Sequence, residues 1–99
     1  MEEAARWLLN RVIDFVGALE DCYRETTFVQ DRPIFADDIA AAAGWIVELQ
    51  RGQEPEVVIE KILSTETDKH FGDYWRNGKW GDYSASALQE LRAAIRERF

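Results

Sequence analysis

The chain has 99 residues, a length that fits one domain over residues 1–99 with a single core. Its hydrophobic fraction of 46% argues against disorder, and its single cysteine and single histidine exclude a disulfide framework and a zinc site of the Cys/His type. The net charge of −7 comes entirely from residues 1–61, and it disfavours direct nucleic-acid binding because no basic stripe can replace phosphate counterions.

We expect a cytoplasmic protein without a membrane segment. The first ten residues, MEEAARWLLN, begin with acids where a secretory signal would carry positive charge. No apolar run approaches the roughly 18 residues that a membrane-spanning helix requires.

Residues 2–24 are predicted to form an amphipathic helix, because apolar residues recur at steps of three and four. Cys22 lies on the apolar face and is expected to behave as a small hydrophobe of the core. Trp7 falls outside this face. The simpler interpretation is that Arg11 or another segment covers its ring, and the alternative is that Trp7 binds a partner. The apolar face comprises Ala5, Leu8, Val12, Phe15, Leu19 and Cys22, widened by Leu9, Val16 and Tyr23.

Residues 26–35 predict an extended connection, because Pro33 disfavours helical backbone at Arg32. The second helix is predicted to begin near Asp37 or Asp38, either of which can cap free N–H groups, and to stop at Gly52. Small residues over 40–44 would allow a neighbouring helix to approach closely. The buried face is expected to comprise Ile39, Ala42, Ala43, Ile46 and Leu49, with Trp45 at its margin.

Two further helices are predicted. Pro55 favours the first turn of a short helix over residues 55–63. The last helix is expected to begin after Tyr83, because Ser86 and Gln89 match a capping box. The short helix has an apolar face of Val58, Ile59, Ile62 and Leu63, and the last helix has a stripe of Leu88, Leu91, Ile95 and Phe99.

Between these helices lies an aromatic stretch, residues 71–83, with the sequence FGDYWRNGKWGDY. Asn77-Gly78 is a strong signal for a type I′ turn, which would pair Trp75 with Trp80 across a short β-hairpin over residues 73–82. That pairing resembles designed tryptophan-zipper peptides. The alternative is a helix over residues 67–77 that stops at Gly78. The predicted fold is therefore mainly α, a four- to five-helix single domain, with a short hairpin as one of two interpretations of the aromatic stretch.

No catalytic constellation is evident in the sequence. His70 has acids at helical spacing, and a general base centred there is one alternative, but a surface histidine in an ion pair is the commoner outcome. A divalent metal held by Asp37, Asp38 and another acid is a further alternative, although acids at helix N-termini already account for these residues. We expect no cofactor and no metal.

Aromatic density and charge asymmetry favour a protein-binding function. Trp, Tyr and Arg are enriched at interface hot spots because each offers a large contact area with a polar handle. The alternatives are that the aromatic stretch only closes the core, or that Trp7 and the final helix are buried in a homodimer. In size and charge the chain resembles small inhibitor and immunity proteins. We expect a non-enzymatic module whose partner is another protein with a basic surface, bound through Tyr74, Trp75, Arg76, Trp80, Tyr83 and Trp7.

Overall fold

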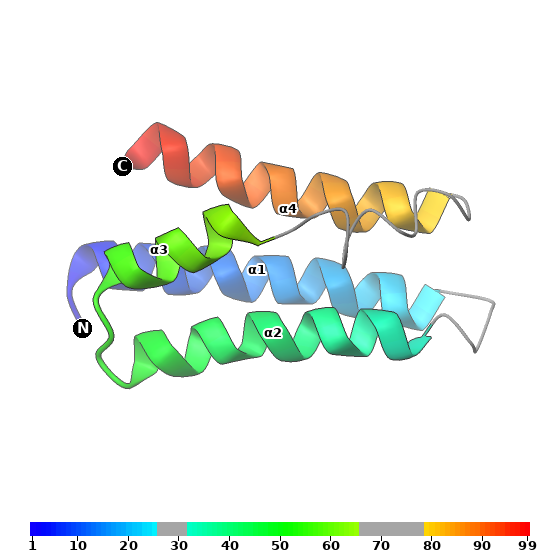
Figure 1. Ribbon diagram of the computed structural model, residues 1–99, viewed down its shortest axis with the longest axis horizontal. Helices are drawn as coiled ribbons and strands as arrows, with labels where there is room; N and C mark the ends of the chain where they lie inside the picture. Colours follow the sequence, from blue (N-terminus) through cyan, green and yellow to red (C-terminus); the bar gives the residue numbers. More distant parts are fainter. Residues whose placement is uncertain (26–31, 66–78) are drawn as a thin grey trace.

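Four helices run alternately up and down in the computed structural model, which describes residues 1–25, 32–65 and 79–99 (Figure 1). They are α1 (Glu3–Glu25), α2 (Arg32–Gln50), α3 (Pro55–Ser64) and α4 (Lys79–Arg98). No strand occurs within these described ranges. The prediction of a mainly α fold with four helices is confirmed.

The first helix is the centre of the arrangement. α1 packs against each of the other three helices, with α2 on one side and α4 on the other (Figure 1). The short helix α3 lies beside the half of α1 where both chain termini are found. α3 has 10 residues and is about 15 Å long, whereas α1 has 23 residues and is about 35 Å long. The short helix therefore covers only part of its neighbours.

Most of the predicted stripe of α1 lies in the core; the side chain of Cys22 is not among those described. Leu8, Val12, Phe15 and Leu19 are all buried, as are Leu88, Leu91 and Ile95 of α4. Trp45 was expected at the margin of α2, but it is only 7% exposed and its ring stacks on Phe15 with centroids 6.2 Å apart. The reason is that the helical wheel gives the direction of a side chain but not the width of the partner helix that covers it.

The second helix begins earlier than predicted, at Arg32 instead of Asp37 or Asp38. Pro33 fits inside its first turn, where the missing N–H is not needed for a hydrogen bond, so it does not delay the helix. Asp38 consequently lies within the helix instead of at its cap, and it is 1% exposed. Residues 26–31 of the predicted connection lie outside the described residues.

The run of small residues in α2 faces the core on one side only. Ala42 is buried, whereas Ala40, Ala41 and Gly44 are exposed. A Cβ atom added at Gly44 would meet nothing within 4 Å. The predicted end of the helix is confirmed: Gly52 has a φ of 92°, and the N–H groups of Gly52 and Gln53 donate to Leu49 and Glu48 in a Schellman arrangement.

The last helix also begins earlier than predicted, at Lys79 instead of after Tyr83. Ser86 is therefore inside α4, and the proposed capping box is wrong. Residues 79–82 are helical, which is incompatible with the second strand of the predicted hairpin, while residues 73–78 lie outside the described residues. Gly81 costs a helix about 1 kcal/mol, a penalty that a long packed helix can absorb.

Candidate functional site

The predicted partner-binding residues fall mostly outside the described part of the chain. Tyr74, Trp75 and Arg76 lie in residues 66–78, as does His70. Trp80 and Tyr83 belong to the first turns of α4, but their side chains are not among those described. Their grouping into one surface therefore stays a prediction. Trp7 is the member of the set whose surroundings are visible.

Trp7 is covered on several sides by its own chain. Its ring meets the ring of Phe99 in an edge-to-face arrangement, with centroids 5.7 Å apart and planes at 63°. The guanidinium carbons of Arg11 and Arg98 lie 5.4 Å and 5.0 Å from the Trp7 centroid, within the range of a cation–π interaction. Arg98 also pairs with Glu3 at 3.3 Å. This supports the simpler interpretation, in which Arg11 packs over the indole, and partner binding by Trp7 stays a prediction.

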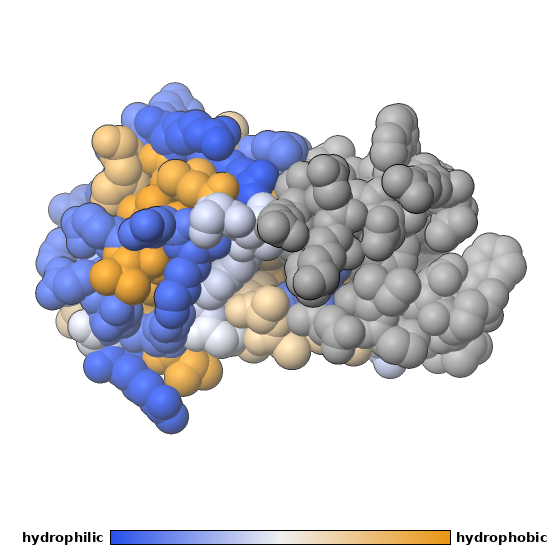
Figure 2. All heavy atoms as spheres, in the orientation of Figure 1, coloured by the Kyte–Doolittle hydropathy of each residue, from blue (hydrophilic) through white to orange (hydrophobic). Residues whose placement is uncertain are grey.

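The structure reveals a surface feature that sequence reasoning missed, an apolar groove along the outer face of α3. We call it the α3 groove. Figure 2 shows apolar side chains gathered over this part of the molecule, with hydrophilic ones around them. The groove has a volume of about 430 Å³. It is lined by Glu56, Ile59, Glu60, Leu63, Ser64 and Phe99.

The α3 groove exists because α3 carries more apolar residues than its neighbours can bury. Val58 and Ile62 point into the core and are fully buried. Ile59 and Leu63 form a second row that is only partly covered, and Val57, on the opposite flank of the buried face, is 38% exposed. Both rows were expected to form one apolar face. The composition of α3 carried a signal for this second row. Five of its ten residues are apolar, which is more than the single stripe that one side of a short helix buries.

Phe99 forms the far wall of the α3 groove. Phe99 was expected at the end of the apolar stripe of the last helix, but it follows the last helical residue and is 52% exposed. Its ring joins the groove to the Trp7 cluster on α1. An exposed aromatic side chain held by a neighbouring ring loses less conformational freedom when it binds.

Acidic residues border the α3 groove on one side. Glu56 and Glu60 are both exposed and lie one turn apart on α3. Neither pairs with a cation in the described structure, since Lys61 pairs with Glu48 of α2. Like charges four residues apart destabilise a helix by about 0.2–0.5 kcal/mol. This pair therefore costs the isolated chain stability, and a positive partner would relieve the repulsion.

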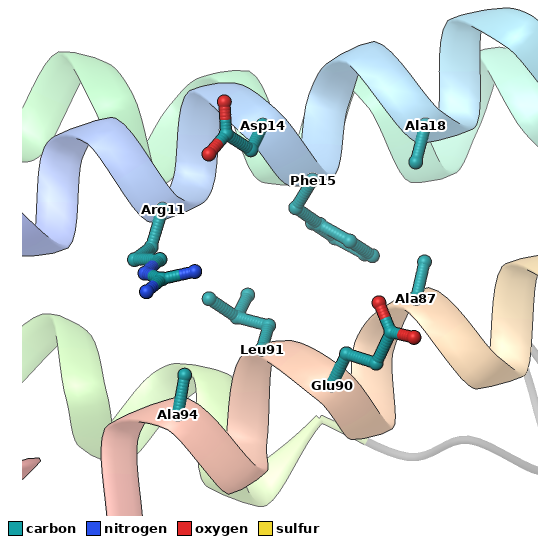
Figure 3. A pocket seen from close by; sticks show the side chains of 8 residues that line it. All are labelled: Arg11, Asp14, Phe15, Ala18, Ala87, Glu90, Leu91 and Ala94. Carbon is teal, nitrogen blue, oxygen red and sulfur yellow. The ribbon is translucent and has the colours of Figure 1, made fainter.

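A second, smaller pocket lies between α1 and α4 (Figure 3). Phe15 and Leu91 point into the gap, and Arg11 and Glu90 reach towards it from opposite helices. Its volume of about 110 Å³ arises because the facing residues Ala18, Ala87 and Ala94 are small. Pockets for drug-sized ligands span roughly 300–1,000 Å³. This pocket suits a few waters or one small group, so the α3 groove is the stronger candidate.

Arg92 is a buried cation with a structural role. It is 7% exposed, and it donates from Nε to the carbonyl of Ile62 at 3.3 Å and from Nη2 to the carbonyl of Thr65. Both carbonyls belong to the end of α3, where C=O groups lack partners within the helix. The carbonyl of Ile62 also accepts the backbone N–H of Thr65. Burial lowers the pKa of Arg92 below its ordinary value, and the nearby charge of Arg96 lowers the pKa further.

Comparison with protein-family models, with curated proteins and with solved structures finds no match to this chain. Among the described helices, none is both long enough and apolar enough to cross a lipid bilayer. Within the same residues, no three His, Cys, Asp or Glu side chains are grouped so as to hold a metal ion.

Proposed function

We infer that this chain is a small acidic, non-enzymatic protein-binding module of the cytoplasm, of the inhibitor, immunity-type or accessory-subunit kind. Its partner is a protein with a basic surface. The observation that carries the proposal is an excess of exposed carboxylates that pair with no cation among the residues that the structure describes. Eight exposed acidic side chains lie in no ion pair within the described residues: Glu2, Asp14, Glu20, Glu54, Glu56, Glu60, Glu90 and Glu97.

Unpartnered carboxylates support binding through long-range attraction. Charges at the rim of an interface steer a basic partner towards the chain and raise the association rate. They contribute less to the final affinity, which depends on a few desolvated aromatic and arginine side chains. The acidic surface and the aromatic residues therefore have separate roles in the proposed complex.

The proposed affinity-determining residues are those of the aromatic stretch: Tyr74, Trp75, Arg76, Trp80 and Tyr83. They concentrate in ten residues the three residue types that are most enriched at hot spots. Trp7 is a peripheral member of this proposed set, because its ring already contacts Phe99 and two arginines.

Affinity capture tests the proposal. Tagged wild-type protein and a Trp75→Ala/Trp80→Ala variant are used as bait, and the captured proteins are identified by mass spectrometry. The matched control is Ile13→Ala/Val47→Ala, which removes two exposed apolar side chains from α1 and α2. We expect a basic partner that the wild type and the control retain and the tryptophan variant loses, with circular dichroism showing all three proteins folded. Identical partner sets for all three would contradict the proposed surface.

Homo-oligomerisation is the second candidate function. Phe99, 52% exposed at the end of the last helix and in contact with Trp7, is the observation that favours it. Light scattering across a concentration series separates the two candidates: a mass that stays near 11.5 kDa excludes the oligomer.

A further inference from the structure

We propose that the α3 groove binds a basic amphipathic helix of another protein. This inference rests on the proposed function and names the site and the chemistry of its partner. The groove is a face of a single helix, formed by positions 56, 59, 60, 63 and 64 of α3, with Phe99 as its wall. Positions at steps of three and four lie on one side of a helix. The groove therefore runs along the α3 axis for about 12 Å.

Two parallel rows define what fits there. Ile59 and Leu63 form an apolar row spaced by four residues, and Glu56 and Glu60 form an acidic row with the same spacing. A helix laid along α3 matches this pattern if it carries apolar residues four apart beside lysines or arginines four apart. Among the described residues, none that lines the groove is basic, so no described lining residue neutralises the acidic row.

A second copy of this chain fits the groove poorly. Two copies would bring together charges of −7 each. The sequence holds one pair of basic residues four apart, Arg92 and Arg96. Arg92 is buried and bound to the carbonyls of Ile62 and Thr65, so it is not available to another chain. A different, basic protein is the better match.

The test uses the full ¹⁵N-labelled chain and three synthetic helical peptides of about 14 residues, long enough to span the groove. The first carries rows of Leu and Lys four residues apart, the second has Glu in place of Lys, and the third is a scrambled Lys/Leu sequence. Chemical-shift changes map the contact, and titration gives the Kd. We expect changes at residues 56–64 and 99, with the Lys peptide bound about tenfold or more tightly than the Glu peptide.

Charge variants distinguish binding in the α3 groove from general electrostatic attraction between the Lys peptide and an acidic protein. Glu56→Gln/Glu60→Gln should weaken binding of the Lys peptide about 3- to 10-fold. Glu20→Gln/Glu90→Gln removes the same charge from two other unpaired acids and should change the Kd less than about twofold. Phe99→Ala removes the exposed wall without opening the core and should also weaken binding.

Equal weakening by the two glutamine variants, shift changes away from α3, or equal binding of the scrambled peptide would overturn the proposal. So would a concentration-dependent dimer that Phe99→Ala dissociates, because a second copy would then fill the groove. If affinity capture yields a partner that Glu56→Gln/Glu60→Gln still binds equally well, this inference fails and the proposed function stands. If the peptides behave as expected but no partner is captured, the proposed function fails and the groove chemistry stands.

Discussion

At the residue scale, Arg92 joins two helices that are separated in sequence. Its guanidinium extends from α4 to the last turn of α3 and supplies donors to the carbonyls of Ile62 and Thr65. The planar fork of arginine can serve two acceptors at once, which the point charge of lysine does less well. The hydrogen bonds of Arg92 hold the end of α3 against α4 and thereby help to position the α3 groove.

Replacing Arg92 with Met should lower the free energy of unfolding by about 1.5–3 kcal/mol, because one buried and one partly buried carbonyl lose a charged donor. Arg92→Lys should recover part of this loss. Urea denaturation monitored by circular dichroism measures the change, and Arg96→Met, at an exposed position one turn on, is the control. Equal effects of Arg92→Met and Arg96→Met would show that the hydrogen bonds contribute nothing.

At the scale of the element, a glycine inside a helix lowers its stability, whereas a glycine just past the end of a helix helps to terminate it. Gly17 and Gly44 lie inside α1 and α2 with ordinary helical backbone and open space at the Cβ position. Gly52 lies just past α2 with a φ of 92°, a conformation that other residues adopt at a cost. The ends of the helices are therefore set by specific backbone geometry, while their interiors tolerate substitution.

Gly17→Ala and Gly44→Ala should each raise the free energy of unfolding by about 0.5–1 kcal/mol, because alanine has the higher helix propensity. Gly52→Ala should lower it by about 1 kcal/mol or more, because it forces an L side chain into the left-handed region. Thermal and urea unfolding of the three variants provide the comparison. A destabilised Gly44→Ala would mean that its surroundings are not as open as the structure shows.

At the scale of the whole molecule, uncompensated negative charge is the dominant surface property. Three ion pairs connect described residues, Asp21 with Arg24, Glu48 with Lys61 and Glu3 with Arg98, and all involve exposed or partly exposed groups. Surface pairs of this kind contribute about 0–1 kcal/mol each. Because each pair joins one cation with one anion, pairing leaves the whole net charge of −7 to act as self-repulsion.

Added NaCl should therefore stabilise the fold. Raising its concentration from about 20 mM to about 300 mM shortens the Debye length from roughly 20 Å to roughly 6 Å, and Tm should rise by about 2–5 °C. Glu2→Gln/Glu20→Gln, which removes two unpaired acids, should show a smaller rise. A Tm that falls with salt would show that the ion pairs outweigh the repulsion. Differential scanning calorimetry gives both values.

Periodicity in the sequence was sufficient to predict four helices and most of their buried residues, such as Leu8, Val12, Leu88 and Ile95. That information is local, because residues three and four apart share a face whatever the rest of the chain does. Element boundaries were less predictable: Pro33 was expected to delay α2, and Ser86 to begin α4. Pro33 and Ser86 each favour a helix boundary locally. The packing of a longer helix outweighs these local preferences.

Only the tertiary structure could reveal the α3 groove and the role of Arg92. Ile59, Leu63 and Phe99 look like core residues in the sequence. They stay partly exposed because α3 is short and, among the described helices, none lies beyond its outer row. Arg92 meets carbonyls 30 and 27 residues away in the chain. Spacing along a helix determines which residues share a face, but only the lengths and packing of the neighbouring helices determine whether that face is covered.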